Sequence, residues 1–290
     1  MTGIKLLQTL SGRDYNDIKR EYIQSFAKTG WHTKPVFPDE EPNTVDLMHI
    51  KPMLDPSWKK PLSEDARKYL AGRMVDKAPF LKEDLFTYQG SKGEYILIPW
   101  VVNGVDAYYQ LNDYKKLGEL KYIFPKNSHK LVYGLDNIDL SWPYIIVFEG
   151  VYDSLFVKNA IAVGTKSISD RQKRLIRKRY PNHRICLSFD NDKPGLDSTA
   201  KAVEKNEDMM FFKWFDDNVS EKDINEKVLK TGDARMFSSP KNLEKMLMTP
   251  LQMKMWLIQK YAYKFGKSRT EKIPQKKRTD PLISRRALFE

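Results

Sequence analysis

Acidic residues follow two apolar stretches of the chain. Glu149 comes directly after the apolar run 145–148, and Asp190 and Asp192 come after the run 185–189, about forty residues later. Each run is typical of a buried strand, and open α/β sheets bind ligands outside the carboxyl ends of their strands. Several carboxylates gathered there need a cation to stay ionised, and their hard oxygens suit Mg²⁺ or Mn²⁺. The pattern therefore predicts a divalent metal site.

Two glycines and a further acid accompany these residues. Gly150 follows Glu149, Gly195 follows Asp192, and both let the backbone approach a ligand closely. Asp153 completes the pattern E-G-x-x-D. Taken singly, "DND" is equally typical of a polar turn and Asp153 of a helix cap. It is the conjunction of E-G-x-x-D after one strand and D-x-D-x-x-G after another that favours a site.

The elements that must position these acids form a regular series. Strands are expected at 144–148, 160–164, 184–190 and 208–215, and helices at 151–159, 169–180 and 195–206. Alternating strands and helices imply βαβ units and a parallel sheet. The strands are apolar without alternation, which suits a sheet that is covered on both faces. We therefore predict an α/β domain over residues 142–235.

The flanking segments differ in composition. Residues 1–61 contain one expected helix (13–30) and a linker rich in proline and acids. Residues 62–141 predict a smaller basic α+β subdomain with a helix at 63–73, capped by Ser63, and strands at 94–101 and 105–111 around an Asn-Gly hairpin turn. Residues 236–290 predict a helical segment (242–265) with a basic tail. The overall class is thus α/β, or α+β when the whole chain is counted.

The charge indicates a class of partner, and the cysteine content limits the kinds of site that the chain can form. The net charge is +12, with 13 basic against 4 acidic residues in 241–290, which favours nucleic acid or an anionic surface as partner. A solvated chain end would explain the basic tail equally well. The single cysteine allows no disulfide within the chain and no cysteine-based zinc site, which suits a reducing cytoplasm. No apolar run is long enough for a membrane span, and no signal peptide is expected.

The acidic motifs resemble the TOPRIM domain of DnaG-like primases, type IA and II topoisomerases and some nucleases. The resemblance implies that Glu149, Asp190 and Asp192 hold Mg²⁺ or Mn²⁺ for phosphoryl transfer. The segment "KDINE" (222–226) is similar to a further primase motif, which would add Asp223 to the metal site and Lys222 to the nucleotide contacts. On its own, "KDINE" is also typical of the first turn of an exposed helix.

The region before the acidic motifs resembles DnaG-like primases in particular. "YILIPWVVNG", "KYIFPKNSHK" and "LVYGLDNID" occur in the order seen there, so the resemblance covers about residues 62–235 and is closest to the phage branch. It implies that Lys121, Lys126 and Lys130 meet phosphates, although a solvated basic loop would look the same. The chain departs from the family in two ways. Gln110 or Asn112 stands where an arginine is usual, and a cysteine-rich zinc domain is missing.

The resemblance implies a DNA primase that makes short RNA primers on single-stranded DNA by metal-dependent nucleotidyl transfer. Its expected partners are the template, NTPs, a replicative helicase and a separate zinc-binding primase subunit, in a bacterial or phage-infected cytoplasm. Two alternatives stay open. One is a TOPRIM nuclease, and the other is a non-catalytic accessory subunit that binds single-stranded DNA and docks on a helicase. The basic helix expected at 169–180 has two interpretations of its own: a solvated outer helix of the sheet, or part of the nucleic-acid path.

Overall fold

The computed structural model describes residues 51–261 except 83, 127–129, 206–207 and 216–218. Every described residue belongs to a single compact unit. The helix expected at 13–30 and the basic tail beyond 261 lie outside the described residues. In the part that is described, no helix is both long and apolar enough to cross a bilayer.

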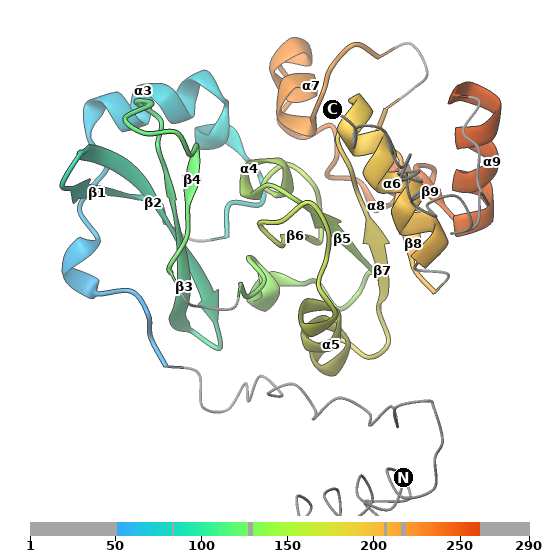
Figure 1. The fold of residues 1–290 in the computed structure, drawn as a ribbon, viewed down its shortest axis with the longest axis horizontal. Helices are drawn as coiled ribbons and strands as arrows, with labels where there is room; N and C mark the ends of the chain where they lie inside the picture. The colour runs from blue at the N-terminus through green and yellow to red at the C-terminus, as the bar shows by residue number, and fades with distance from the viewer. Residues whose placement is uncertain (1–50, 83, 127–129, 206–207, 216–218, 262–290) are drawn as a thin grey trace, which may run out of the picture. The chain divides into compact units, whose positions relative to one another are not determined.

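The first sheet is antiparallel and precedes the acidic motifs. Its strands are β1 (Phe86–Gly90), β2 (Gly93–Val102), β3 (Val105–Asn112) and β4 (Tyr122–Ile123), in that order (Figure 1). Helices η2 (Pro56–Trp58), α3 (Glu64–Gly72) and η3 (Val75–Lys77) come before it. The Asn103-Gly104 turn has φ values of 53° and 71°, as the predicted hairpin requires. Ser63 caps α3 by accepting a hydrogen bond from the Ala66 amide.

Strand β2 is buried on both faces and connects the first sheet to the second. Leu97 packs in a cluster with Leu54 and Leu111 on one side. On the other side, the Trp100 ring contacts Tyr133. The backbone of Tyr133 pairs with Ala162 in the second sheet. The two sheets are therefore connected through Tyr133, whose ring packs on β2 and whose backbone is hydrogen-bonded to β6.

The second sheet carries the acidic motifs. It has the order β6-β5-β7-β8-β9, with four parallel strands and an antiparallel edge strand (Figure 1). Its strands are β5 (Tyr144–Phe148), β6 (Ala160–Ala162), β7 (Arg184–Leu187), β8 (Met210–Phe212) and β9 (Leu247–Met248). The short helix η4 (Leu135–Asn137) precedes it, and its helices are α4 (Val151–Ser154), α5 (Asp170–Arg179), α6 (Lys193–Lys205), α7 (Ile224–Thr231), α8 (Pro240–Glu244) and α9 (Pro250–Tyr261). The predicted α/β class is confirmed.

Two expected helices differ from the structure. The helix expected at 151–159 ends at Ser154, and turns lead on to Asn159, whose φ is 52° and whose Nδ2 donates to the Asp139 carbonyl. The helix expected at 242–265 is interrupted, because Met248 pairs with Phe211 at the edge of the sheet. Pro250 then begins α9, since proline suits the first turn of a helix.

Burial should make the cysteine unreactive. Cys186 lies in β7 with no exposed surface, and burial raises the pKa of its thiol to about 12. Because the thiolate is the reactive form, we expect native protein at pH 8 to react with a disulfide reagent only on unfolding. Labelling with and without urea checks this, and rapid labelling of the native protein would contradict the packing of β7.

Candidate active site

The carboxyl ends of β5 and β7 lie side by side. The two strands are parallel, with Ile146 opposite Cys186 and Val147 opposite Leu187. Glu149 directly follows β5, and Asp190 comes three residues after the end of β7. The structure thus brings the two predicted acids to one edge of the sheet, as parallel strands with these ends must.

Asp190 interacts electrostatically with three other acids. Loss of hydration raises the pKa of its carboxyl to about 6, and the negative charges of Asp223, Glu149 and Asp192 act in the same direction. Lys222 opposes this shift. Desolvation also raises the pKa of Glu149, against the favourable charge of Lys166. The four acids therefore interact at the strand ends, and a positive charge there is electrostatically favoured.

The raised pKa of Asp190 predicts a pH dependence of stability. The folded protein holds this proton more tightly than the unfolded chain, whose value is near 3.8. The free energy of unfolding should therefore fall as the pH rises from about 4 to above 6. With divalent cations chelated, Asp190→Asn should lose less stability than wild type over this window. Urea unfolding at several pH values measures the difference, and parallel curves would contradict it.

Asp153 and Asp223 hold the N-terminus of α7. Asp223 is its N-cap and accepts from the Glu226 amide at 2.8 Å. Asp153 Oδ1 accepts a hydrogen bond from the amide of Asn225, one residue earlier in the same turn, at 3.1 Å. Desolvation raises the pKa of Asp153, and the charges of Asp223 and Asp190 add to the shift. "KDINE" thus does begin a helix, and Asp153 caps that helix rather than α4, in which it lies. The metal-binding role of Asp223 stays a prediction.

Asn191, the middle residue of "DND", fixes the distance between the two acidic segments. Its amide Nδ2 donates to the carbonyls of Val219 and Glu221 at 3.0 and 3.1 Å, and its backbone amide donates to the carbonyl of Lys222. These bonds hold segment 219–223 against the end of β7. Sequence reasoning assigned Asn191 no role, although an amide side chain inside a turn is a recognisable signal.

Removing the Asn191 side chain should loosen this connection. Asn191→Ala loses two hydrogen bonds and leaves two carbonyls without their partner, so we expect about 1–3 kcal/mol lower stability. Amide exchange should also accelerate in α7 more than in β2. Urea unfolding and hydrogen exchange by mass spectrometry measure both effects, and uniform exchange in the two elements would contradict this role.

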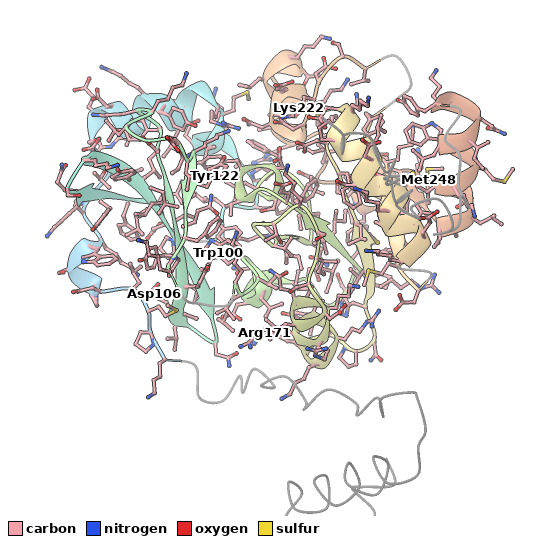
Figure 2. The ribbon with its side chains drawn as sticks, viewed as in Figure 1. Trp100, Asp106, Tyr122, Arg171, Lys222 and Met248 are labelled. Atoms are coloured by element: carbon pink, nitrogen blue, oxygen red, sulfur yellow. The ribbon has the colours of Figure 1, made fainter. Side chains whose placement is uncertain are left out.

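Basic side chains reach the same edge from two directions. Lys222 Nζ lies 3.4 Å from Asp192 Oδ2 and 3.9 Å from Asp190 Oδ2, and Figure 2 shows it at the base of α7. Lys130 Nζ donates to the Gly164 carbonyl and lies 3.6 Å from the centre of the Phe124 ring. Burial lowers the pKa of Lys130, and the negative charge of Glu149 opposes this shift. Lys222 and Lys130 thus lie beside the acids.

The other two predicted lysines lie further along the same segment. The Lys121 ammonium covers the Tyr122 ring at 5.1 Å, and Lys126 is exposed on the loop after β4. Burial raises the pKa of Tyr122 most, and the negative charges of Asp153 and Asp223 add to the shift, so Tyr122 lies near these two acids. Phosphate contacts by Lys121 and Lys126 stay predictions.

Residues 146–228 match the model of the Toprim-like family. The matched segment runs from β5 into α7 and contains all five acids described above. Among solved structures, a DnaG catalytic core aligns with a TM-score of 0.48 and 16% identity, over 69% of this chain and 78% of that one. A DnaG primase catalytic domain bound to single-stranded DNA aligns with a TM-score of 0.42 and 15% identity, over 68% and 63%. A search of curated proteins finds no match.

Arg73 links the Toprim-like segment to the first sheet, and sequence reasoning missed it. Its guanidinium lies 4.8 Å from the centre of the Tyr152 ring, and its carbonyl accepts from Asn225 Nδ2. The Tyr152 hydroxyl accepts from Asn112 Nδ2 at 2.8 Å. Asn112 is therefore buried and hydrogen-bonded, and Gln110 is buried as well. Neither side chain can replace the expected arginine at the surface.

The carboxylate oxygens of the Toprim-like segment are the kind of ligand that a hard divalent cation prefers. Four carboxylates interact at one edge, and their mutual repulsion disfavours full ionisation without a positive charge. As the side chains stand, no three His, Cys, Asp or Glu residues among those described are close enough to hold an ion. Lys222 is the cation that contacts Asp190 and Asp192 in this arrangement. Metal binding would therefore require side-chain rotation here.

Proposed function

We propose that the chain is a DNA primase that makes short RNA primers on single-stranded DNA by metal-dependent nucleotidyl transfer. The observation that carries the proposal is the electrostatic interaction of Asp190 with Glu149, Asp192 and Asp223 within a Toprim-like segment. The order of the upstream motifs supports primer synthesis over other Toprim reactions. It also supports residues 62–141 as a basic subdomain, 142–235 as the catalytic domain and the flanking 1–61 and 236–290 as separate segments.

In the proposed reaction, the acidic residues would bind the metal and the lysines would contact phosphates. Glu149, Asp190 and Asp192 would hold Mg²⁺ or Mn²⁺, with Asp223 completing the set. When bound, the metal supplies positive charge that orients a triphosphate and stabilises the leaving pyrophosphate. Lys130, beside Glu149, would neutralise phosphate oxygens from the side of the first sheet. Lys121, Lys126 and Lys222 would add contacts to template or nucleotide, so that catalysis rests on positioning and electrostatics.

The proposal includes partners. The template and NTPs follow from the reaction itself. A replicative helicase and a separate zinc-binding subunit would supply unwinding and start-site choice in a bacterial or phage-infected cytoplasm. Adding such proteins should raise primer yield, but the basic reaction should not depend on them.

One assay tests the proposal against its alternatives. Labelled NTPs, single-stranded DNA and Mg²⁺ or Mn²⁺ are incubated with the full chain, and the products are separated by size. Primase activity predicts labelled RNA products that appear only with template and metal. Shortening of the DNA would instead indicate a nuclease. DNA binding without either product would indicate an accessory subunit.

A further inference from the structure

A hollow lies beside the acidic edge, between α5 and α6. It has a volume of about 630 Å³ and is bounded by the loop 166–170 and by the α6 segment 198–205. Right-handed crossovers from β6 to β7 and from β7 to β8 place α5 and α6 on the same face of the sheet. The volume lies in the range of small-molecule sites. A ligand of nucleotide size would therefore fit between the two helices.

The walls of this hollow are strongly basic. Four lysines line it (Lys166, Lys173, Lys201 and Lys205) against one acid, Asp170. Lys173 Nζ lies 3.2 Å from Asp170 Oδ1, which offsets that one negative charge. Lys201 and Lys205 are exposed and four residues apart on α6, so their ammonium groups repel each other. The hollow therefore favours a ligand with several negative charges.

The floor of the hollow is apolar. Ile168, Leu187, Phe189 and Ala202 contribute to its lining. Phe189 is only partly buried, and its carbonyl accepts from Trp214 Nε1, which fixes the chain at this point. An accessible aromatic ring offers a flat surface on which any base can stack. An apolar floor under a basic rim is complementary to a molecule that has a base at one end and phosphates at the other.

We propose that the α5–α6 hollow binds a nucleoside polyphosphate, with the base against Phe189 and the phosphates among the lysines. The site differs from the phosphate contacts assigned to Lys121, Lys126 and Lys130, which lie upstream of β5. It does not depend on the proposed primase reaction. A smaller hollow that shares Lys166 and Phe189 has Glu149 in its lining, so the bound phosphates lie near the acidic edge. A compact polyphosphate concentrates charge more than an extended nucleic-acid backbone does, which favours the nucleotide.

Binding to the full chain in EDTA tests the proposal, because chelation removes the metal from the acidic edge. The probes are ATP, inorganic tripolyphosphate and a twelve-residue oligothymidylate, measured by calorimetry. K201E/K205E should weaken ATP and tripolyphosphate binding by about tenfold or more, since two attractive charges become repulsive. The matched control K241E/K245E makes the same charge change at the same spacing, on α8 and its C-cap, and should stay within about twofold.

Comparing the variants and the three probes distinguishes nucleotide binding from binding of a nucleic-acid backbone. Unchanged ATP affinity in K201E/K205E overturns the proposal, and so does an equal loss in the control. If only oligothymidylate binding depends on Lys201 and Lys205, the hollow is a backbone site and the nucleotide proposal is wrong. ATP binding is measured in EDTA, whereas NTP incorporation requires the metal, so loss of this site and loss of catalysis are distinguishable. Thermal unfolding of each variant verifies that it is folded.

Discussion

Asp190→Asn should abolish primer synthesis while leaving the protein folded. We expect the rate of NTP incorporation to fall by about 10³-fold or more, because the variant loses the carboxylate that interacts with each of the other acids at the strand ends. Folding should not suffer, since the charged form of Asp190 is disfavoured in the folded protein. The measurement is incorporation of labelled NTPs on single-stranded DNA, together with thermal unfolding in EDTA.

A carboxylate elsewhere provides the control. Asp76 is exposed in η3, outside the Toprim-like segment, so Asp76→Asn should keep wild-type activity within about twofold. Retained incorporation by Asp190→Asn would remove Asp190 from the metal site. Loss of activity with loss of folding would mean that the side chain acts structurally.

Gly195→Ala should have the largest effect on structure. A Cβ atom at Gly195 would lie 2.1 Å from the Asp190 carbonyl oxygen and 2.8 Å from its carbonyl carbon. The first turn of α6 and the "DND" loop would have to move apart, which also breaks the 2.8 Å bond from the Gly195 amide to Asp192 Oδ1. We expect a loss of about 2–4 kcal/mol in stability and loss of primer synthesis. Urea unfolding and the incorporation assay measure the two effects.

Gly72 offers a matched control, because it also lies in a helix. No atom lies within 4 Å of a Cβ built at Gly72, near the end of α3. Gly72→Ala should therefore change stability by less than about 1 kcal/mol, in the stabilising direction. If both variants were equally stable, the close approach of Gly195 to Asp190 would not describe the protein.

Much of the Toprim-like segment was predictable because its signals are local. Apolar runs of strand length predict β5 and β7, and parallel pairing then dictates that Glu149 and Asp190 share an edge. The Asn-Gly turn likewise predicts the β2–β3 hairpin. Strand β9 was not predictable, since two residues carry no period and pair with β8 only through tertiary structure. Strand β4, which also has only two residues, was unpredictable for the same reason.

The parts of the site that sequence did not reveal depend on contacts between distant residues. Asn225 lies 152 positions from Arg73 and hydrogen-bonds to its carbonyl, which no spacing rule anticipates. Asp153 was expected to complete the E-G-x-x-D motif or to cap a helix, and only the packing of α4 on α7 shows which helix it caps. The basic hollow combines residues from α5 and α6 that look like ordinary solvated lysines in the sequence.

Iron-directed cleavage would test the metal centre most directly. Fe²⁺ replaces Mg²⁺ at oxygen sites and, with ascorbate and peroxide, cuts the backbone next to where it is bound. We predict metal-dependent cuts close to Glu149 and to Asp190–Asp192, suppressed by excess Mg²⁺ and absent in Asp190→Asn. Cuts that lie elsewhere, or that Mg²⁺ does not suppress, would contradict a divalent metal site at the strand ends.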